Sequence, residues 1–152
     1  MTRSEEPAGC VFCIAKTIAD GQRLVVHDGQ LAYVILNKYP YNAGHLMVVP
    51  QRHVAHLAAL EDAELLEMAK LTQLSERVLT EAYQPQGINV GMNLGRPAGA
   101  GIVDHLHIHL VPRWNGDTNF MTVVGEVRVL PEELPRTAER LRPLFRKFSA
   151  GG

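Results

Sequence analysis

The stretch that decides this fold is residues 105–111, which read His-Leu-His-Ile-His-Leu-Val. Its histidines alternate with apolar residues, the period at which a β-strand places side chains on one face. We therefore expect a strand over residues 105–111 that buries Leu106, Ile108 and Leu110. Its other face would present a row of imidazoles about 7 Å long. Such a row needs polar partners or a ligand.

Three interpretations of this row follow from the residues alone. The histidines can be solvated or hydrogen-bonded side chains, or they can be ligands of a three-histidine metal site with an open fourth position. They can also act on an anionic substrate, because imidazole titrates near pH ~6.5 and one neutral ring can attack phosphorus while a neighbour stays cationic beside a phosphate. The glycine-rich segment 95–101 favours this third interpretation, since its backbone N–H groups can approach phosphate oxygens closely.

The rest of the chain alternates strand and helix patterns around this stretch. Short apolar runs predict strands over residues 24–26, 31–36, 46–49 and 88–94, with a turn at residues 27–29 between the first two. A long helical pattern covers residues 60–83, and a second amphipathic helix is expected over residues 131–148. Strands interrupted by a long helix indicate the α+β class.

Composition restricts the class of protein. A length of 152 residues with 46% hydrophobic and 20% charged residues predicts one domain over residues 1–152, with residues 1–9 as a flexible N-terminal tail. The formal net charge of -1 argues against a nucleic-acid partner. The start is polar and no run approaches about 20 apolar residues, so we expect no membrane partner and a cytoplasmic location.

The chain's 2 cysteines, Cys10 and Cys13, form a Cys-x-x-Cys pair. In a reducing compartment this spacing indicates metal binding or redox chemistry more than a structural disulfide. The spacing alone does not choose between reduced structural thiols, a redox pair and a zinc site, because the remaining ligands decide.

Residues 105–111, followed by Pro112 and Arg113, resemble the alternating signature of the histidine-triad (HIT) superfamily. The resemblance also covers residues 11–14, 36–37, 44–50, 93–95 and 98–99. Residues 112–121 are similar to the bacterial branch that includes diadenosine tetraphosphate phosphorylases. Membership implies a HIT-like α+β fold with an antiparallel sheet, one long central helix and a C-terminal helix. It also implies a homodimer and catalysis through a covalent nucleotidyl-histidine.

The resemblance implies three catalytic histidines. The central His107 would be the nucleophile, His109 would bind the phosphate and assist the leaving group, and His45 would support them. Neutral imidazole would attack the α-phosphorus, and water or inorganic phosphate would then cleave the P–N bond.

The resemblance also implies a purine-nucleotide site. Asn37 would hold the ribose hydroxyls, while apolar residues would form the walls around the base. The full set of expected substrate contacts is Phe12, Ile14, Leu36, Asn37, Asn93, Gly99, Ala100, Gly101, Ile102 and His109. Most relatives carry glutamine or serine after the Ala-Gly pair, whereas this chain has Ala100 and Gly101, which offer only backbone donors to an acceptor phosphate. This departure places phosphorolysis in question.

The resemblance to zinc-bearing members implies ligands for the cysteine pair. Cys10 and Cys13 would combine with His53 and His105, a closed set typical of structural zinc. His56 is an alternative to His53 in sequence position.

We therefore expect an enzyme, a nucleotide hydrolase or nucleotidyltransferase acting on dinucleoside polyphosphates such as diadenosine tetraphosphate. Two alternatives stay open. One is a nucleoside phosphoramidate or AMP-conjugate hydrolase, which substrate profiling would separate. The other is a non-enzymatic nucleotide sensor, which would bind nucleotide without releasing product.

Overall fold

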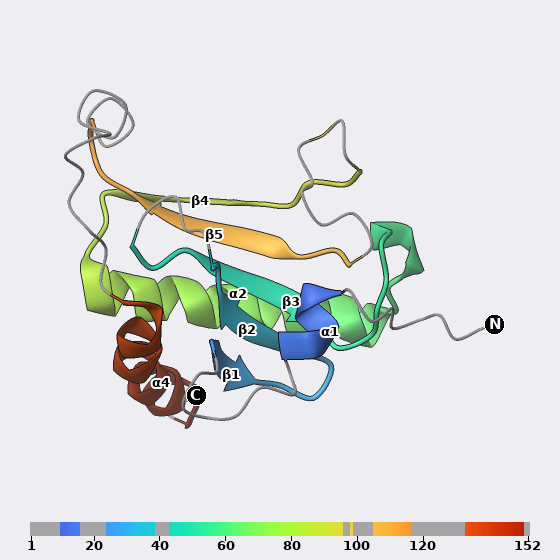
Figure 1. Cartoon of the computed structure of the whole chain (residues 1–152), viewed down its shortest axis with the longest axis horizontal. Coiled ribbons are helices and arrows are strands. Elements are labelled where there is room, and N and C mark those ends of the chain that lie inside the picture. Colours follow the sequence, from blue (N-terminus) through green and yellow to red (C-terminus); the bar gives the residue numbers. More distant parts are fainter. Residues whose placement is uncertain are drawn as a thin grey trace.

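The computed structural model describes residues 10–15, 24–38, 43–95, 98, 105–116 and 133–150. Within these residues, 5 strands form one antiparallel sheet in the order β1-β2-β3-β5-β4 (Figure 1). The strands are β1 (Val25–Asp28), β2 (Ala32–Leu36), β3 (Leu46–Pro50), β4 (Gly87–Gly91) and β5 (Ile108–Arg113). This order places β3 and β5 in the centre and β4 at an edge.

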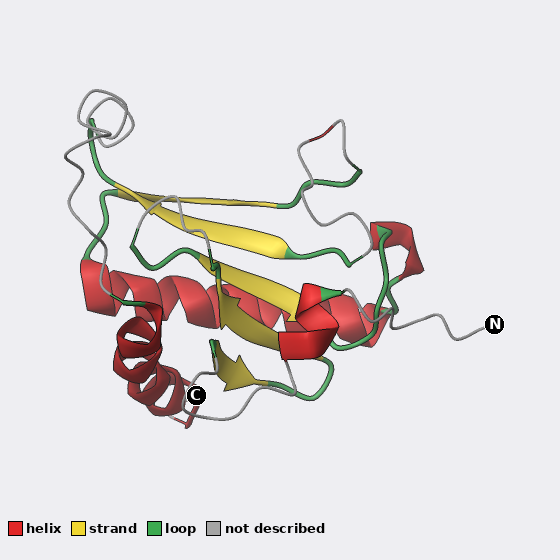
Figure 2. Ribbon diagram, viewed as in Figure 1, coloured by secondary structure: helices red, strands yellow, loops and turns green. Residues whose placement is uncertain are grey.

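Helices cover both sides of the sheet (Figure 2). They are α1 (Val11–Ala15), the short 3-10 helix η3 (Leu57–Ala59), α2 (Asp62–Tyr83) and α4 (Leu134–Ala150). The long α2 crosses one side of the sheet, and α1 lies on the other (Figure 1). The expected α+β class, with an antiparallel sheet, a long helix and a C-terminal helix, is confirmed. The described part of the chain contains no helix that is both long enough and apolar enough to span a membrane.

Alternation along β2 divides the core in two. Val34 and Leu36 belong to the larger core, which packs under α2 and α4. Tyr33 and Ile35 belong to a smaller core that packs against Phe12 of α1. We call this second side the histidine face, because His109 of β5 pairs with Met47, a member of the smaller core. Successive strand residues point to opposite faces, so one strand serves both cores.

The segment between β3 and α2 is held by charge-assisted hydrogen bonds. Arg52 donates two hydrogen bonds to the Glu64 carboxylate, at 2.8 and 2.7 Å, and a third at 2.9 Å to the carbonyl of Ala59. Glu61 and Glu64 form a capping box, which satisfies backbone donors at the start of α2. The helix therefore begins at Asp62, two residues after the expected start, and ends as expected at Tyr83.

The expected strand over residues 105–111 is wrong at its beginning. The ladder between β3 and β5 starts at the pair Val48–Ile108, so His105 and His107 precede the strand. Pro50 has no N–H with which to extend the pairing, and the N–H of Leu106 donates instead to the carbonyl of Val54 at 2.8 Å. Leu106 and Leu110 are nevertheless buried as expected.

The other strand boundaries shift for similar reasons. Because β5 begins at Ile108, the expected strand over residues 88–94 finds a partner only as far as Gly91. The first strand continues to Asp28 instead of ending at residue 26, with an irregular pairing between Val25 and His27. The expected second and third strands, over residues 31–36 and 46–49, appear at Ala32–Leu36 and Leu46–Pro50. The C-terminal helix, expected over residues 131–148, runs over Leu134–Ala150.

Candidate active site and metal centre

Three imidazoles meet on the histidine face, and we call His45, His107 and His109 the histidine cluster. His45 immediately precedes β3, His107 immediately precedes β5, and His109 lies in β5. The ring centroids of His107 and His109 are 4.6 Å apart, and those of His45 and His109 are 5.1 Å apart. His45 and His107 are buried, at 1% and 6% exposure. The structure thus brings together the three histidines expected to be catalytic.

A backbone carbonyl determines which nitrogen of His107 carries the proton. Nδ1 of His107 lies 3.0 Å from the carbonyl oxygen of His105. A carbonyl oxygen can only accept, so Nδ1 donates to it. In the neutral ring, Nε2 of His107 therefore has the free lone pair, which is the electronic requirement for a nucleophile.

His109 is connected to Asn37 through His45. Nδ2 of Asn37 lies 3.3 Å from Nε2 of His45, which in turn lies 2.9 Å from Nδ1 of His109. An amide nitrogen only donates, so Nε2 of His45 accepts from Asn37 and also from Nδ1–H of His109. This arrangement leaves Nε2 of His109 as the nitrogen that can receive or deliver a proton toward a ligand.

Burial favours the neutral form of all three rings. Burial, together with the neighbouring imidazoles, lowers the pKa of His45 and of His109 to about 4. Burial also lowers the pKa of His107, opposed by its hydrogen bond to the carbonyl of His105. The expectation that a neighbouring ring is cationic beside a phosphate stays a prediction.

The residues expected to contact the nucleotide do not all lie on the same side of the sheet. Asn37 lies beside His45, and the buried Phe12 ring lies 4.9 Å from that of His107. Ile14, on the same helix as Phe12, is 44% exposed, and Asn93 is exposed after β4. Leu36 instead belongs to the core under α2, on the far side of the sheet from the histidines.

Ile35, the residue before Leu36, lies on the histidine face instead. It belongs to the smaller core on the histidine face and is two residues from Asn37. Strand alternation alone identifies it, because residues i and i+2 share a face. The expected contacts Gly99, Ala100, Gly101 and Ile102, and the expected tail over residues 1–9, lie outside the described residues.

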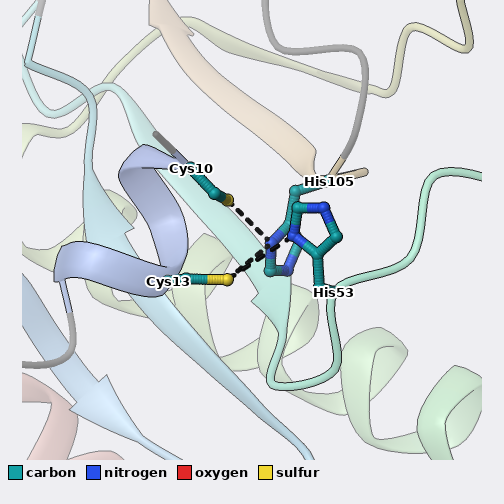
Figure 3. A group of neighbouring side chains, drawn as sticks. All are labelled: Cys10, Cys13, His53 and His105. Atoms are coloured by element: carbon teal, nitrogen blue, oxygen red, sulfur yellow. Dashed lines mark hydrogen bonds between the residues drawn. The ribbon is translucent and has the colours of Figure 1, made fainter. Parts of the chain in front are cut away.

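A second group of ligating side chains comes from α1 and the residue before it, from the segment after β3 and from the residues just before β5 (Figure 3). We call Cys10, Cys13, His53 and His105 the metal cluster, because their ligand atoms all lie within 4.8 Å of one another. His105 Nδ1 is 3.4 Å from Cys10 Sγ and 3.8 Å from Cys13 Sγ, and His53 Nδ1 is 3.5 Å from Cys13 Sγ. His56, the alternative to His53, is exposed beside η3 and is not in the cluster.

These separations fit a tetrahedral ion. Zinc bound at about 2.3 Å to sulfur and about 2.0–2.1 Å to nitrogen gives a sulfur–nitrogen edge of about 3.6 Å. Nε2 of His105 lies 2.8 Å from the carbonyl oxygen of Pro50, so Nε2 carries the proton and Nδ1 presents its lone pair to the cysteines. Metal-bound histidines almost always donate their other ring N–H in this way. The sequence did not indicate this role of Pro50.

Comparisons with known proteins agree with this geometry. The HIT domain model matches residues 20–116, more than half of the chain. The chain is 48% identical over 124 residues to the AP-4-A phosphorylase of Mycobacterium tuberculosis, an alignment that covers 82% of this chain but only 64% of that relative's length. It is 29% identical over 133 residues to an adenosine 5'-monophosphoramidase of Schizosaccharomyces pombe, covering 87% of this chain and 95% of that protein.

A solved structure is similar over nearly the whole chain. The crystal structure of a Zn-bound histidine triad family protein from Mycobacterium smegmatis superposes with a TM-score of 0.74 and 25% identity. The match covers 95% of this chain and 98% of that one. The resemblance stated from the sequence is therefore confirmed at the level of family and fold.

Proposed function

The chain belongs to the HIT family, and on that premise we propose that it cleaves the α-phosphate linkage of dinucleoside polyphosphates such as diadenosine tetraphosphate. The observation that carries this proposal is the tautomer of His107. Its Nδ1–H donates to the carbonyl of His105, so Nε2 keeps its lone pair. Burial lowers the pKa of this ring, which favours the neutral form that a nucleophile needs. The name of the M. tuberculosis relative supports this substrate class.

The reaction has two steps. Nε2 of His107 forms a bond to the α-phosphorus, and the P–O bond to the leaving polyphosphate breaks, which gives a nucleotidyl-histidine. Water or inorganic phosphate then attacks the same phosphorus, the P–N bond breaks, and the electron pair returns to Nε2 of His107. Two moderate barriers replace one high barrier.

His109 would bind the phosphate and assist departure of the leaving group. An anionic phosphate beside it favours the imidazolium form, so substrate binding raises its pKa from the low value in the free protein. A proton on Nε2 can then pass to the leaving oxygen, while Nδ1–H stays bonded to His45. Because His45 touches His109, it supports the reaction by orienting that ring.

The nucleoside would lie beside β2. We propose that Asn37 holds the ribose hydroxyls, that Ile14 and Ile35 flank the base, and that Asn93 and the backbone of residues 99–102 contact the phosphates. The exposure of Ile14 and the placement of Ile35 on the histidine face support these assignments.

We also propose that the metal cluster holds structural zinc. The donor separations support this assignment, as does the zinc bound by the similar histidine triad protein of M. smegmatis. With two cysteines and two histidines as ligands, zinc leaves no open position and would supply folding free energy, not a catalytic water. Cys10 and Cys13 form no disulfide in the structure, which agrees with the reducing cytoplasm that we propose as the compartment.

A homodimer is the assembly we propose. β4 is an edge strand, and Val90 on it is 53% exposed. Unpaired edges of this kind invite pairing with another chain. Light scattering tests it, and a mass near that of one chain would overturn it.

Product analysis tests the proposed reaction directly. Wild type and His107→Ala are compared on diadenosine tetraphosphate with and without inorganic phosphate. ADP formed only with phosphate identifies a phosphorylase despite Ala100 and Gly101, and AMP plus ATP without phosphate identifies a hydrolase. Normal turnover by His107→Ala would overturn the proposal.

A second candidate is hydrolysis of AMP conjugates such as phosphoramidates, which the name of the S. pombe relative favours. It uses the same nucleophile and differs in the leaving group. Turnover of adenosine 5'-phosphoramidate without turnover of diadenosine tetraphosphate would select it.

A further inference from the structure

His105 belongs to both halves of the site. Its Nδ1 faces the cysteines, its Nε2–H donates to the carbonyl of Pro50, and its own carbonyl accepts the Nδ1–H of His107. The residue is completely buried. A displacement of His105 therefore moves the acceptor that determines both the tautomer and the ring direction of His107.

Phe12 makes a second connection between the two clusters. It lies between Cys10 and Cys13 in the sequence. The centroid of its ring is 5.4 Å from that of His105 and 4.9 Å from that of His107. The hydroxyl of Tyr33 donates to the Phe12 carbonyl at 2.8 Å, which ties α1 to β2. Only 2% of the surface of Phe12 is exposed, so this residue has almost no surface left for contact with a nucleotide base.

We propose that Cys10, Phe12 and Cys13 form a clamp that positions His107, with Phe12 as a positioning residue, and that an ion bound by the metal cluster holds this clamp in place. This inference rests on the proposed function. With the thiolates and His105 held around one ion, the carbonyl of His105 and the ring of Phe12 constrain His107 from two sides. Apolar packing and the Tyr33 hydrogen bond also connect α1 to this side of the sheet.

The expected effect is on the chemical step. A nucleophile displaced by about 1 Å can lose about 10²-fold in rate while substrate contacts elsewhere are unchanged. Loss of the clamp should therefore lower kcat much more than it changes KM. A purely structural role would lower the thermal stability and leave kcat of the folded fraction intact.

The first test uses Cys13→Ser, because Cys13 contacts both His53 and His105. The folded, metal-depleted variant should show kcat lowered about 10- to 100-fold with KM within about 3-fold of wild type. The independent readout is the ¹⁵N NMR spectrum of the histidine rings at fixed pH, assigned with His107→Gln. The signal of a single Nδ1–H tautomer at His107 should give way to a tautomer mixture.

The second test keeps every ligand. Phe12→Ala should retain zinc and nucleotide affinity, lower kcat about 10-fold and broaden the His107 ring signal, and Phe12→Leu should restore part of both. Val11→Ala is the matched control on the same helix, because Val11 is 53% exposed. This second variant decides the question if Cys13→Ser does not fold.

The outcomes separate the two proposals. If wild type forms no nucleotidyl-His107, the proposed function fails, and the ring tautomer of His107 still tests the clamp. If metal-depleted Cys13→Ser and Phe12→Ala keep wild-type kcat and the His107 tautomer, the clamp is overturned and the metal cluster acts on stability alone.

Discussion

The metal cluster and the histidine cluster are neighbours built from the same kind of side chain. Both use residues of the segment 105–109, and both are buried against the smaller core. In the metal cluster, thiols stand within 4 Å of imidazole nitrogens. In the histidine cluster, the imidazoles form hydrogen bonds with imidazole, amide and backbone groups. The groups facing each ring therefore distinguish the proposed metal ligands from the proposed nucleophile.

In each cluster a backbone carbonyl accepts a hydrogen bond from one ring nitrogen of a histidine, but the nitrogen differs between the two clusters. Pro50 accepts from Nε2 of His105, so Nδ1 of His105 is a lone pair that can bind metal. His105 accepts from Nδ1 of His107, so the lone pair there is on Nε2. Two histidines separated by one residue thus present different nitrogens, and substitutions in each cluster should have different consequences.

The largest expected effect is on the nucleophile. His107→Ala should lower turnover of diadenosine tetraphosphate by about 10⁴-fold or more, because the proposed covalent intermediate forms on Nε2 of His107. Mass spectrometry of the trapped nucleotidyl-enzyme should lose its adduct. The matched control is His27→Gln, since His27 stacks on Phe145 under α4, away from the site. Retained adduct in His107→Ala would refute the assignment.

Metal loss should be the next largest effect. Cys10→Ser should reduce bound zinc and lower the melting temperature by about 10 °C, because an ion that binds only the folded state adds about 3–4 kcal/mol when well above its Kd. Atomic emission and calorimetry measure the two quantities. His56→Asn, which alters an exposed neighbour, should change neither. Unchanged metal per chain in Cys10→Ser would rule out the site.

Acidification should weaken the fold through the histidine cluster. The pKa of His45 and of His109 is about 4 in the folded protein, against about 6.5 in the unfolded chain. The unfolded state binds more protons between these values, so stability is present above pH ~6.5 and is lost as pH falls toward ~4. Melting temperature measured against pH checks this.

His45→Gln is the control for that experiment. It removes one of the buried imidazoles and leaves the four metal ligands in place, so the slope of melting temperature against pH should become shallower. An equal slope in wild type and His45→Gln would assign the acid sensitivity to other groups, with protonation of the metal ligands as the alternative source.

The smallest expected effect is on orientation. His45→Ala should lower kcat about 3- to 10-fold, because His45 touches His109 and not the reacting atoms. Steady-state kinetics with diadenosine tetraphosphate measures it, and His45→Gln, which keeps a polar group, should recover part of the rate. A loss as large as that of His107→Ala would make His45 a direct participant.

Local patterns in the sequence predicted much of this molecule. The long helix, the hairpin and the succession of strands along the chain follow from period and turn residues, which depend on neighbours a few positions apart. The strand start at Ile108 was missed because it depends on Pro50, more than 50 residues earlier. The face on which Leu36 lies could not be read from its strand, because all residues of that strand are buried.

By itself, the sequence determined the family, the residue types at both clusters and the spacing that allows each. Only the tertiary structure decided that His53 and not His56 joins the cysteines, that Ile35 faces the histidines, and which nitrogen each imidazole presents. The physical reason is distance along the chain: backbone geometry sets periodicity locally, whereas a ligand set or a tautomer depends on carbonyls and side chains that only folding brings together.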